Sequence, residues 1–464
     1  MSDRAREAVL GAVVVAGALG GLAYGAVANP IGPPVTSAAT RFVERATFCP
    51  PSLDQAHSGS SVDVASAASS DVAVEFRGAP SGHAVLHPRR ILLRSSKERA
   101  LDVVGYGAPL AAAATTTLRS KVGGAATTTC SLTGGRRWYF PAGTSAIGSS
   151  ERLLVYNPFP QEAVVRVRFF TPSGERIASN LASVGVGIGR TIEIDVNRFV
   201  APENVLSATV SAIRGRVVAW KAVTVRGKKH AHGLELSLGA TAVERVWFLP
   251  GGAVGKGVGE RLFVLNPNDK EAVVTVSLLT PRGTLQPRGL LRVRVPPRSS
   301  KSLSLSGAPR RTRSKVSSAG ALVSASSAPG VVAERTESYV TRRVRGFASE
   351  IGAAGAATQW SLGASTPNAR ADVVWIMNPG PRRARVSVSL LQASAPPRQP
   401  SALSDVRVAP GSSVRLDLGR WTRGRPMVAL VSSNAPVAAE RSWYAPRSAD
   451  IADVMGVPLT PTSP

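Results

Sequence analysis

The stretch Glu260-Arg-Leu-Phe-Val-Leu-Asn-Pro267, followed by Ala272-Val-Val-Thr-Val-Ser-Leu-Leu279, decides the fold that we expect for this chain of 464 residues. Upstream and downstream copies read Glu151-Arg-Leu-Leu-Val-Tyr-Asn-Pro158 with Ala163-Val-Val-Arg-Val-Arg-Phe-Phe170, and Asp372-Val-Val-Trp-Ile-Met-Asn-Pro379 with Ala384-Arg-Val-Ser-Val-Ser-Leu-Leu391. The three copies align without a gap, which indicates an internal repeat of roughly 110 residues, a usual size for a sandwich domain.

The second half of each copy alternates apolar and polar side chains, as Val274, Val276 and Leu278 do against Thr275 and Ser277. This period of two predicts a strand with one face in a core and the other in water. Asn-Pro ends the strand before it, because proline has no N–H and the asparagine side chain can bond its own turn. Two strands joined by this short polar turn predict a hairpin.

The length suggests about three or four domains, and a composition rich in Val, Ala, Ser, Thr and Gly favours short strands. We therefore predict an all-β protein of tandem Ig-like antiparallel β-sandwich modules after a single N-terminal transmembrane helix. The expected divisions are a short cytoplasmic N-terminus (1–7), a transmembrane anchor or signal peptide (8–28), a linker (29–46), a diverged sandwich module (47–135), three further sandwich modules (136–243, 244–357, 358–458) and a tail (459–464).

The segment Ala8–Ala28 is uncharged and largely apolar, and it has about the length that spans a bilayer as a helix. Ala26-Val27-Ala28 also fits the small-residue pattern of a signal-peptidase site, so a retained anchor and a cleaved signal both stay open. We expect a single-pass cell-membrane protein with its bulk outside the cytoplasm, or a secreted protein if the segment is cleaved. A buried helix of a cytoplasmic domain fits less well, because the segment is terminal and prolines follow it.

Cys49 and Cys130 are the two cysteines of the chain. In an exported protein they most simply form one disulfide, here between the first and last strands of the first module. Two unpaired buried thiols are the alternative.

The chain carries 56 Lys and Arg against 29 Asp and Glu, a net charge of +27. This excess predicts an anionic partner, unless a genomic bias towards arginine codons scatters the charge over the surface. An export segment disfavours cytoplasmic nucleic acid as that partner, and no nucleic-acid-binding motif is present. The possible polyanion contacts are Arg226, Lys228, Lys229, Arg310, Arg311, Arg313, Lys315, Arg342, Arg343, Arg345, Arg382, Arg383 and Arg385.

No nucleophile elbow, phosphate-cradling loop or zinc-protease motif occurs, and we expect no enzyme activity, cofactor or metal. A glycosidase needs two carboxylates across one cleft, whereas Glu151, Glu260 and Asp372 occupy equivalent positions in separate modules. That repetition favours a structural role, such as pairing with arginine across strands. His230 and His232 would share one face of a strand, but Lys229 precedes them and a solvated hairpin tip is the simpler interpretation.

Trp138, Trp247 and Trp360 open the last three modules. They could be ligand platforms, but tryptophans at repeated positions favour packing anchors with satisfied N–H groups.

Four features together resemble an uncharacterised family of high-GC Gram-positive (actinobacterial) bacteria: the N-terminal anchor, Cys49-Pro50, Trp138-Tyr-Phe-Pro-Ala-Gly143, and Leu153-Leu-Val-Tyr-Asn-Pro-Phe159 followed by Val164-Val-Arg-Val167. The family comprises extracytoplasmic proteins with one N-terminal membrane segment and a domain of unknown function. The resemblance implies a cell-envelope context, because its genes often lie near a large glycosyltransferase gene. It supplies no catalytic residues.

We expect a non-enzymatic, membrane-tethered rod of sandwiches that binds or positions an anionic wall polymer or a membrane-bound partner such as a glycosyltransferase. One alternative is an accessory component of an envelope glycosyltransferase or hydrolase system, with a site at a module junction. Another is a purely structural spacer.

Overall fold

The computed structural model describes residues 44–463, apart from residues 54–57, 79–80, 97–98, 120–122, 227–230, 254, 307–317, 327, 343, 368 and 446–448. The chain divides into two units, Met1–Val43 and Glu44–Pro464, and the first of them lies outside the described residues together with the predicted anchor Ala8–Ala28. Within the described ranges, no helix has both the length and the apolar character needed to cross a membrane.

The described chain is built almost wholly of antiparallel strands, with one turn of α-helix, α3 (Gly419–Thr422), and the 3-10 turns η2 (Ser179–Leu181), η3 (Val196–Arg198), η4 (Arg288–Leu290) and η5 (Ser401–Leu403). Module 1 contains β1 (Glu44–Cys49), β2 (Ser58–Ala65), β3 (Val72–Arg77), β4 (Gly82–Leu86), β5 (Ile91–Ser96), β6 (Leu101–Tyr106), β7 (Ala111–Leu118) and β8 (Ala125–Thr129). Module 2 contains β9 (Arg137–Gly143), β10 (Ser149–Tyr156), β11 (Ala163–Thr171), β12 (Gly174–Arg176), β13 (Val184–Val186), β14 (Thr191–Asp195), β15 (Leu206–Arg214), β16 (Val218–Val225) and β17 (Gly233–Leu238).

Modules 3 and 4 repeat the plan of module 2. Module 3 contains β18 (Val246–Leu249), β19 (Val258–Asn266), β20 (Ala272–Thr280), β21 (Gly283–Leu285), β22 (Val293–Val295), β23 (Ser299–Ser304), β24 (Gly320–Ala325), β25 (Val332–Val340) and β26 (Arg345–Ile351). Module 4 contains β27 (Ala357–Leu362), β28 (Ala371–Asn378), β29 (Ala384–Leu391), β30 (Val406–Val408), β31 (Ser412–Asp417), β32 (Val428–Tyr444), β33 (Ile451–Met455) and β34 (Val457–Pro458).

Each module is sandwich-like, with two small antiparallel sheets, and this confirms the all-β prediction. One sheet, which we call the axial sheet, has the order β5-β2-β7-β8 in module 1, β14-β10-β16-β17 in module 2 and β23-β19-β25-β26 in module 3. The other, the outer sheet, has β1-β6-β3-β4 in module 1 and is built around β11 and β15, β20 and β24, or β29 and β32 in the later modules. The long strand β32 serves both sheets of module 4, since it pairs with β28 as well as β29.

The predicted alternation is present, because Val165, Val167 and Phe169 of β11 are buried while Arg166 is exposed. The predicted hairpin is wrong. β10 pairs with β14 and β16, whereas β11 pairs with strands of the outer sheet. The Asn-Pro turn is a corner between the two sheets: buried Asn157 donates from Nδ2 to the carbonyls of Gln161 (2.8 Å) and Val186 (3.0 Å). Asn266 and Asn378 make the equivalent bonds.

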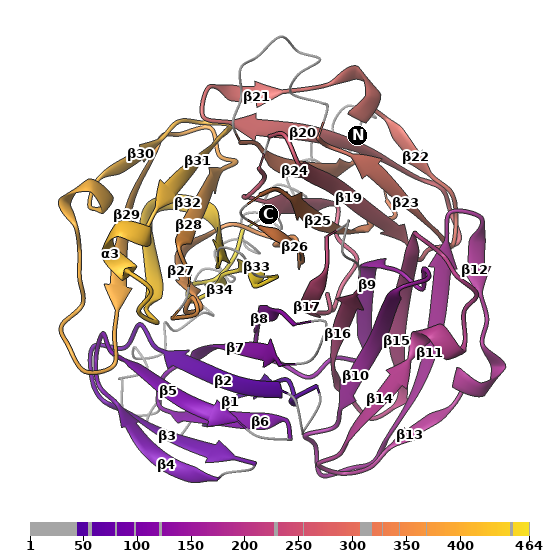
Figure 1. Cartoon of the computed structure of the whole chain (residues 1–464), viewed down its shortest axis with the longest axis horizontal. Helices are drawn as coiled ribbons and strands as arrows, with labels where there is room; N and C mark the ends of the chain where they lie inside the picture. Colours follow the sequence, from indigo (N-terminus) through magenta and orange to yellow (C-terminus); the bar gives the residue numbers. More distant parts are fainter. Residues whose placement is uncertain are drawn as a thin grey trace, which may run out of the picture. The chain divides into compact units, whose positions relative to one another are not determined.

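Within the Glu44–Pro464 unit the modules close on themselves, and the extended rod that we predicted is not formed (Figure 1). The last strand of each axial sheet contacts its neighbours in the cyclic order β8, β17, β26, β33 and back to β8. Outer sheets pack on the axial sheet of the next module, as Phe170 does in the core of module 3 and Leu391 of module 4 does with Ile91 of module 1. The physical reason lies in runs such as Leu153-Leu154-Val155, whose side chains are all buried and which therefore give the sheet two apolar faces.

Three local expectations can be compared with the structure. Cys49 and Cys130 form a disulfide, which ties the end of β1 to the residue after β8. Trp138, Trp247 and Trp360 are buried, and each Nε1 donates to a backbone carbonyl, so they are packing anchors. In the predicted tail (459–464), Leu459 N donates to Gln359 O (3.0 Å), and Ser463 forms a β-bridge with Ala356.

Candidate functional site

Buried ion pairs join the modules. At the junction of modules 2 and 3, Lys221 Nζ donates to Glu334 Oε1 (2.6 Å) and to the carbonyl of Ala142. The amide of Ala142 donates to the other oxygen of Glu334 (2.7 Å). A carboxylate of one module therefore binds a cation and a backbone N–H of the module before it.

The same arrangement recurs at the junction of modules 3 and 4, and part of it recurs at the junction of modules 4 and 1, where the ion pair of the arginine lies within module 4. Arg335 of module 3 donates to Glu440 of module 4 and to the carbonyl of Gly251, whose amide donates to Glu440 Oε2 (3.0 Å). Arg441 of module 4 donates to Gly363 O (2.6 Å), and Ala364 N donates to Asp63 Oδ1 of module 1 (3.1 Å). We call these three groups the junction clamps. At the junction of modules 1 and 2, Tyr156 OH donates to Asp102 (3.0 Å) instead.

The repeated acids at the strand starts lie beside the clamp cations within each module. Arg441 binds Asp372 through Nε (2.8 Å) and Nη2 (2.7 Å), and Arg335 Nε lies 3.9 Å from Glu260. Glu151 is buried and accepts from Thr144 N (2.7 Å). These three acids are in three different modules, and the structure does not bring them to one cleft.

Carboxyl groups outnumber cations in the interior. Ten acids and three bases are buried among the described residues, and burial raises the pKa of Glu151 to about 8, of Glu235 to about 7 and of Asp63 to about 6. The rest of the chain holds 53 of the 56 basic residues but only 19 of the 29 acids. The surface is therefore more basic than the composition alone indicates.

Four equivalent hairpins converge at one end of the ring axis. This is the end at which the last strand of each axial sheet begins. A Cβ on Gly124 would lie 2.8 Å from Leu234 N, one on Gly233 would lie 2.8 Å from Ala449 Cβ, and one on Gly346 would lie 2.7 Å from Ile451 Cγ2. Contacts this close join all four modules. They place the hairpins β7–β8, β16–β17, β25–β26 and β32–β33 around one point.

Exposed arginines lie close to the ends of these hairpins in the sequence. We give the name basic crown to Arg119, Arg226, Arg342 and Arg345, which lie in or beside three of these hairpins and are all exposed. The half-buried Asp450 lies at the start of β33 at the same end. Three crown residues are among the predicted polyanion contacts, and Arg119 was missed because module 1 departs from the repeat.

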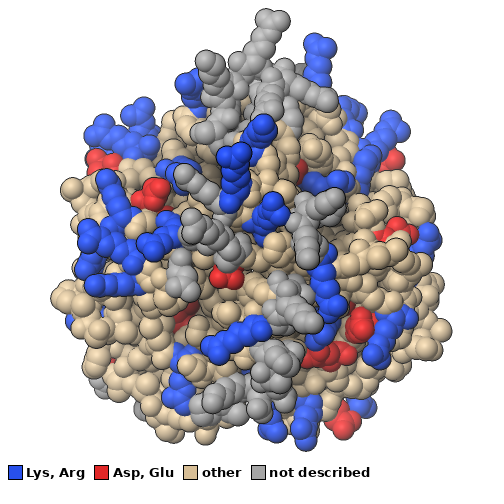
Figure 2. Space-filling model, viewed as in Figure 1, with Lys and Arg blue, Asp and Glu red and all other residues tan. Residues whose placement is uncertain are grey.

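The other predicted contacts are distributed differently. Arg382, Arg383 and Arg385 are exposed at the start of β29, at the outer edge of module 4 (Figure 1). Lys228, Lys229, Arg310, Arg311, Arg313, Lys315 and Arg343 lie outside the described residues. Figure 2 shows basic side chains around the whole rim of the face in view and nearer its centre, with fewer acidic ones. The distribution of basic residues alone therefore does not identify one binding surface. The convergence of the four axial hairpins does identify one.

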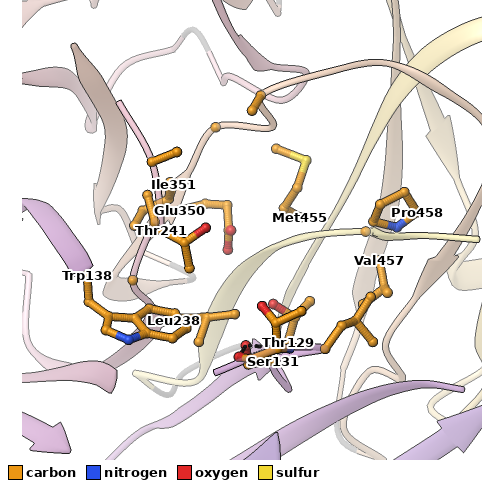
Figure 3. A pocket seen from close by; sticks show the side chains of 18 of the residues that line it. Thr129, Ser131, Trp138, Leu238, Thr241, Glu350, Ile351, Met455, Val457 and Pro458 are labelled. Atoms are coloured by element: carbon orange, nitrogen blue, oxygen red, sulfur yellow. Dashed lines mark hydrogen bonds between the residues drawn. The ribbon is translucent and has the colours of Figure 1, made fainter. Parts of the chain in front are cut away.

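A cavity of about 350 Å³, the axial cavity, lies where the axial strands end, opposite the crown (Figure 3). All four modules line it, through Ser131, Leu238, Ile351 and Met455 among others. Two carboxyl groups, Glu244 and Glu350, belong to its lining, and no lysine or arginine does. Neither the cavity nor Glu350 was found from the sequence, since Glu350 has no counterpart in the other modules.

Of the two neighbouring histidines considered from the sequence, His230 lies outside the described residues. Among the residues that are described, no group of three or more His, Cys, Asp or Glu is placed to hold a metal ion.

Comparison with known proteins finds a match to a model described as "Family of unknown function (DUF5719)" over residues 96–334 and 316–441. No curated protein matches. A Thermotoga maritima structure titled "Crystal Structure of Thermotoga maritima 1070" is similar, with 20% identity over 23% of this chain and 98% of that chain, and a TM-score of 0.21. A likeness at this level carries no functional argument.

Proposed function

Because the chain belongs to the DUF5719 family, whose function is unknown, we propose its function from its charge distribution: it is a non-enzymatic protein of the cell envelope that binds an anionic polymer through the basic crown. The polymer class is a polyphosphate or an acidic glycan. The predicted segment Ala8–Ala28 supports tethering of this ring to the membrane.

One observation carries the proposal. Acids are concentrated in the junction clamps and the interior, while exposed arginines of three modules lie in or beside the hairpins that converge at one end of the axis. Clustered cations on a rigid scaffold bind a polyanion by releasing its counter-ions, and no cleft or moving part is needed. The disulfide and the clamps supply the rigidity.

The test is binding of the full-length protein to immobilised inorganic polyphosphate over a series of NaCl concentrations. We expect the logarithm of the association constant to fall linearly with the logarithm of salt concentration. Replacing Arg119, Arg226, Arg342 and Arg345 with Gln should lower affinity at least tenfold and flatten the slope by about 0.7 for each arginine that contacts the polymer.

A matched control replaces Arg382, Arg383, Arg385 and Arg407 with Gln, because these four exposed arginines give the same change in net charge at the edge of module 4. It should lose less than half as much in log affinity. Equal losses in the two variants would show that net charge alone attracts the polymer, and salt-insensitive or absent binding would remove the proposal.

The axial cavity favours a second candidate, an accessory component of an envelope glycosyltransferase or hydrolase system with a site where modules meet. This role predicts a small ligand in the cavity and retention of a membrane-bound partner on a column of the full-length protein.

A further inference from the structure

The axial cavity differs in charge from everything around it. The chain carries a net charge of +27, yet the cavity lining contains two carboxyl groups and no Lys or Arg. A polyanion is therefore the class of ligand that this cavity suits least. Its apolar walls include Leu238, Ile351 and Met455, and its volume of about 350 Å³ is in the range of small-molecule sites.

Glu350 is the buried ionisable group that lines the cavity. It is 9% exposed, and Figure 3 shows its carboxyl group projecting into the space between the axial strands. Glu350 pairs in register with the clamp cation of module 3. The residues at the equivalent position in modules 1, 2 and 4 are Thr128, Ser237 and Val454. Only module 3 places an acid at this level of the axis.

No basic side chain in the described part of the chain forms an ion pair with Glu350. Arg335 lies opposite it in the register of β25 and β26, but that guanidinium binds Glu440 and the carbonyl of Gly251. Burial raises the pKa of Glu350 well above its usual value, and the neighbouring Glu440, Glu334 and Asp453 add to the rise, while a hydrogen bond from the Met455 backbone opposes it. The cavity therefore presents a buried carboxyl group whose protonated form is favoured by burial and which has no cationic partner among the described residues.

We propose that the axial cavity binds a small organic cation, with a primary ammonium group beside Glu350 and a short apolar body against Leu238, Ile351 and Met455. An ammonium ion beside Glu350 favours the ionised form of the carboxyl group, so any proton that the carboxyl group holds leaves to the solvent as the ion pair forms. An adjacent cation stabilises a carboxylate in apolar surroundings far more than it stabilises one in water, because the local dielectric constant is lower. Glu244 supplies a second negative charge in the lining. This site does not depend on polyanion binding.

The test uses three probes with the same body and different heads: hexylammonium, 1-hexanol and hexanoate. Each is titrated calorimetrically into the full-length protein at pH 7, in two buffers with different enthalpies of ionisation. We expect hexylammonium to bind at least tenfold more tightly than hexanol, hexanoate to bind more weakly than both, and hexylammonium alone to release protons on binding.

The Glu350→Gln variant should fold normally, since glutamine has a similar shape and carries no charge that burial would disfavour, and its melting temperature checks this. It should lower hexylammonium affinity at least tenfold, abolish proton release and leave hexanol within twofold. Ser237→Ala, at the equivalent position of module 2, should leave all three probes unchanged. Equal affinities for hexylammonium and hexanol, an unchanged preference in Glu350→Gln, or no binding of any probe would each overturn the proposal.

Discussion

Adjacent residues of a strand point to opposite faces of its sheet, and the pairs Glu334-Arg335 and Glu440-Arg441 use this alternation. In each pair the acid faces the preceding module, and the arginine enters the interior of its own sandwich beside Glu260 or Asp372. The repeat predicts the pairing of arginine with Asp372 or Glu260 across strands within a module. The contacts between modules could not be predicted, because the repeat does not show which modules become neighbours.

Removing a clamp cation should be costly. Lys221→Met leaves Glu334 buried without its partner, and loss of one member of a buried pair typically destabilises by about 3–5 kcal/mol. The measurement is the free energy of unfolding in urea. The control is Arg198→Met, since Arg198 pairs with Asp195 at the surface (3.2 Å) and such pairs contribute about 0–1 kcal/mol. Similar losses in both variants would contradict a special role for the clamp.

Stability should fall as the pH rises from about 4 to about 8. Glu151, Glu235 and Asp63 have pKa values raised to about 8, 7 and 6. A raised pKa in the folded state means that stability is greatest below the unfolded-state pKa and is lost as pH rises through the folded value. The melting temperature should therefore decline between about pH 4, the unfolded-state pKa of a carboxyl group, and about pH 8, and level off above that.

Glu151→Gln tests this assignment, because glutamine keeps the shape of the protonated acid and cannot ionise. It should change the melting temperature little at pH 5 and raise it relative to the parent at pH 9. Exposed Glu162, replaced in the same way, should leave the curve unchanged. A melting temperature that rises with pH in the parent would contradict the sign of this linkage.

At the scale of elements, the convergence of the axial strands depends on glycine. Gly233 has a φ of +129° and no space for a Cβ beside Ala449, whereas Gly174 has a φ of +116° and nothing within 4 Å. Comparing alanine at the two positions separates crowding from backbone strain. We expect Gly174→Ala to cost about 1 kcal/mol and Gly233→Ala about 1–3 kcal/mol more, measured by urea unfolding. Equal costs would show that the axis is not tightly packed.

The strands themselves could be predicted, and their pairing could not. The alternation in Ala163–Phe170 correctly indicates a half-buried strand, and Asn157 correctly indicates its boundary. A short turn between two strands also suits a hairpin, however, and nothing local distinguishes that from the observed corner between two sheets. The asparagine decides it by binding the carbonyl of Val186, 29 residues away.

At the scale of the whole molecule, the difference between a rod and a ring lies in the second apolar face of each sheet. Runs such as Leu262-Phe-Val-Leu265 are apolar at consecutive positions, and a strand buried on both faces has this pattern. The repeat predicts the number of modules, and the same apolar runs also indicate that neighbouring modules pack side by side. The axial cavity and the crown follow from ring closure, so neither could be predicted from a module taken alone.

Ring closure predicts that the modules depend on one another. A chain that ends at residue 356 lacks module 4, and the deletion uncovers Phe248 and Leu279 of module 3 together with Ala65 and Ile91 of module 1. In a rod, the three remaining sandwiches would stay folded and monomeric. In a ring, we expect aggregation in size-exclusion chromatography and binding of a dye that reports exposed apolar surface.

A point substitution tests ring closure without the deletion of a module. Leu391 is fully buried between modules 4 and 1, so Leu391→Asp places a charge in the closing junction. We expect it to lower the melting temperature of the whole ring in one transition, since every module is held by two neighbours. Loss of module 4 alone, with the other three melting as in the parent, would instead show that the junctions contribute little and that each sandwich is stable by itself.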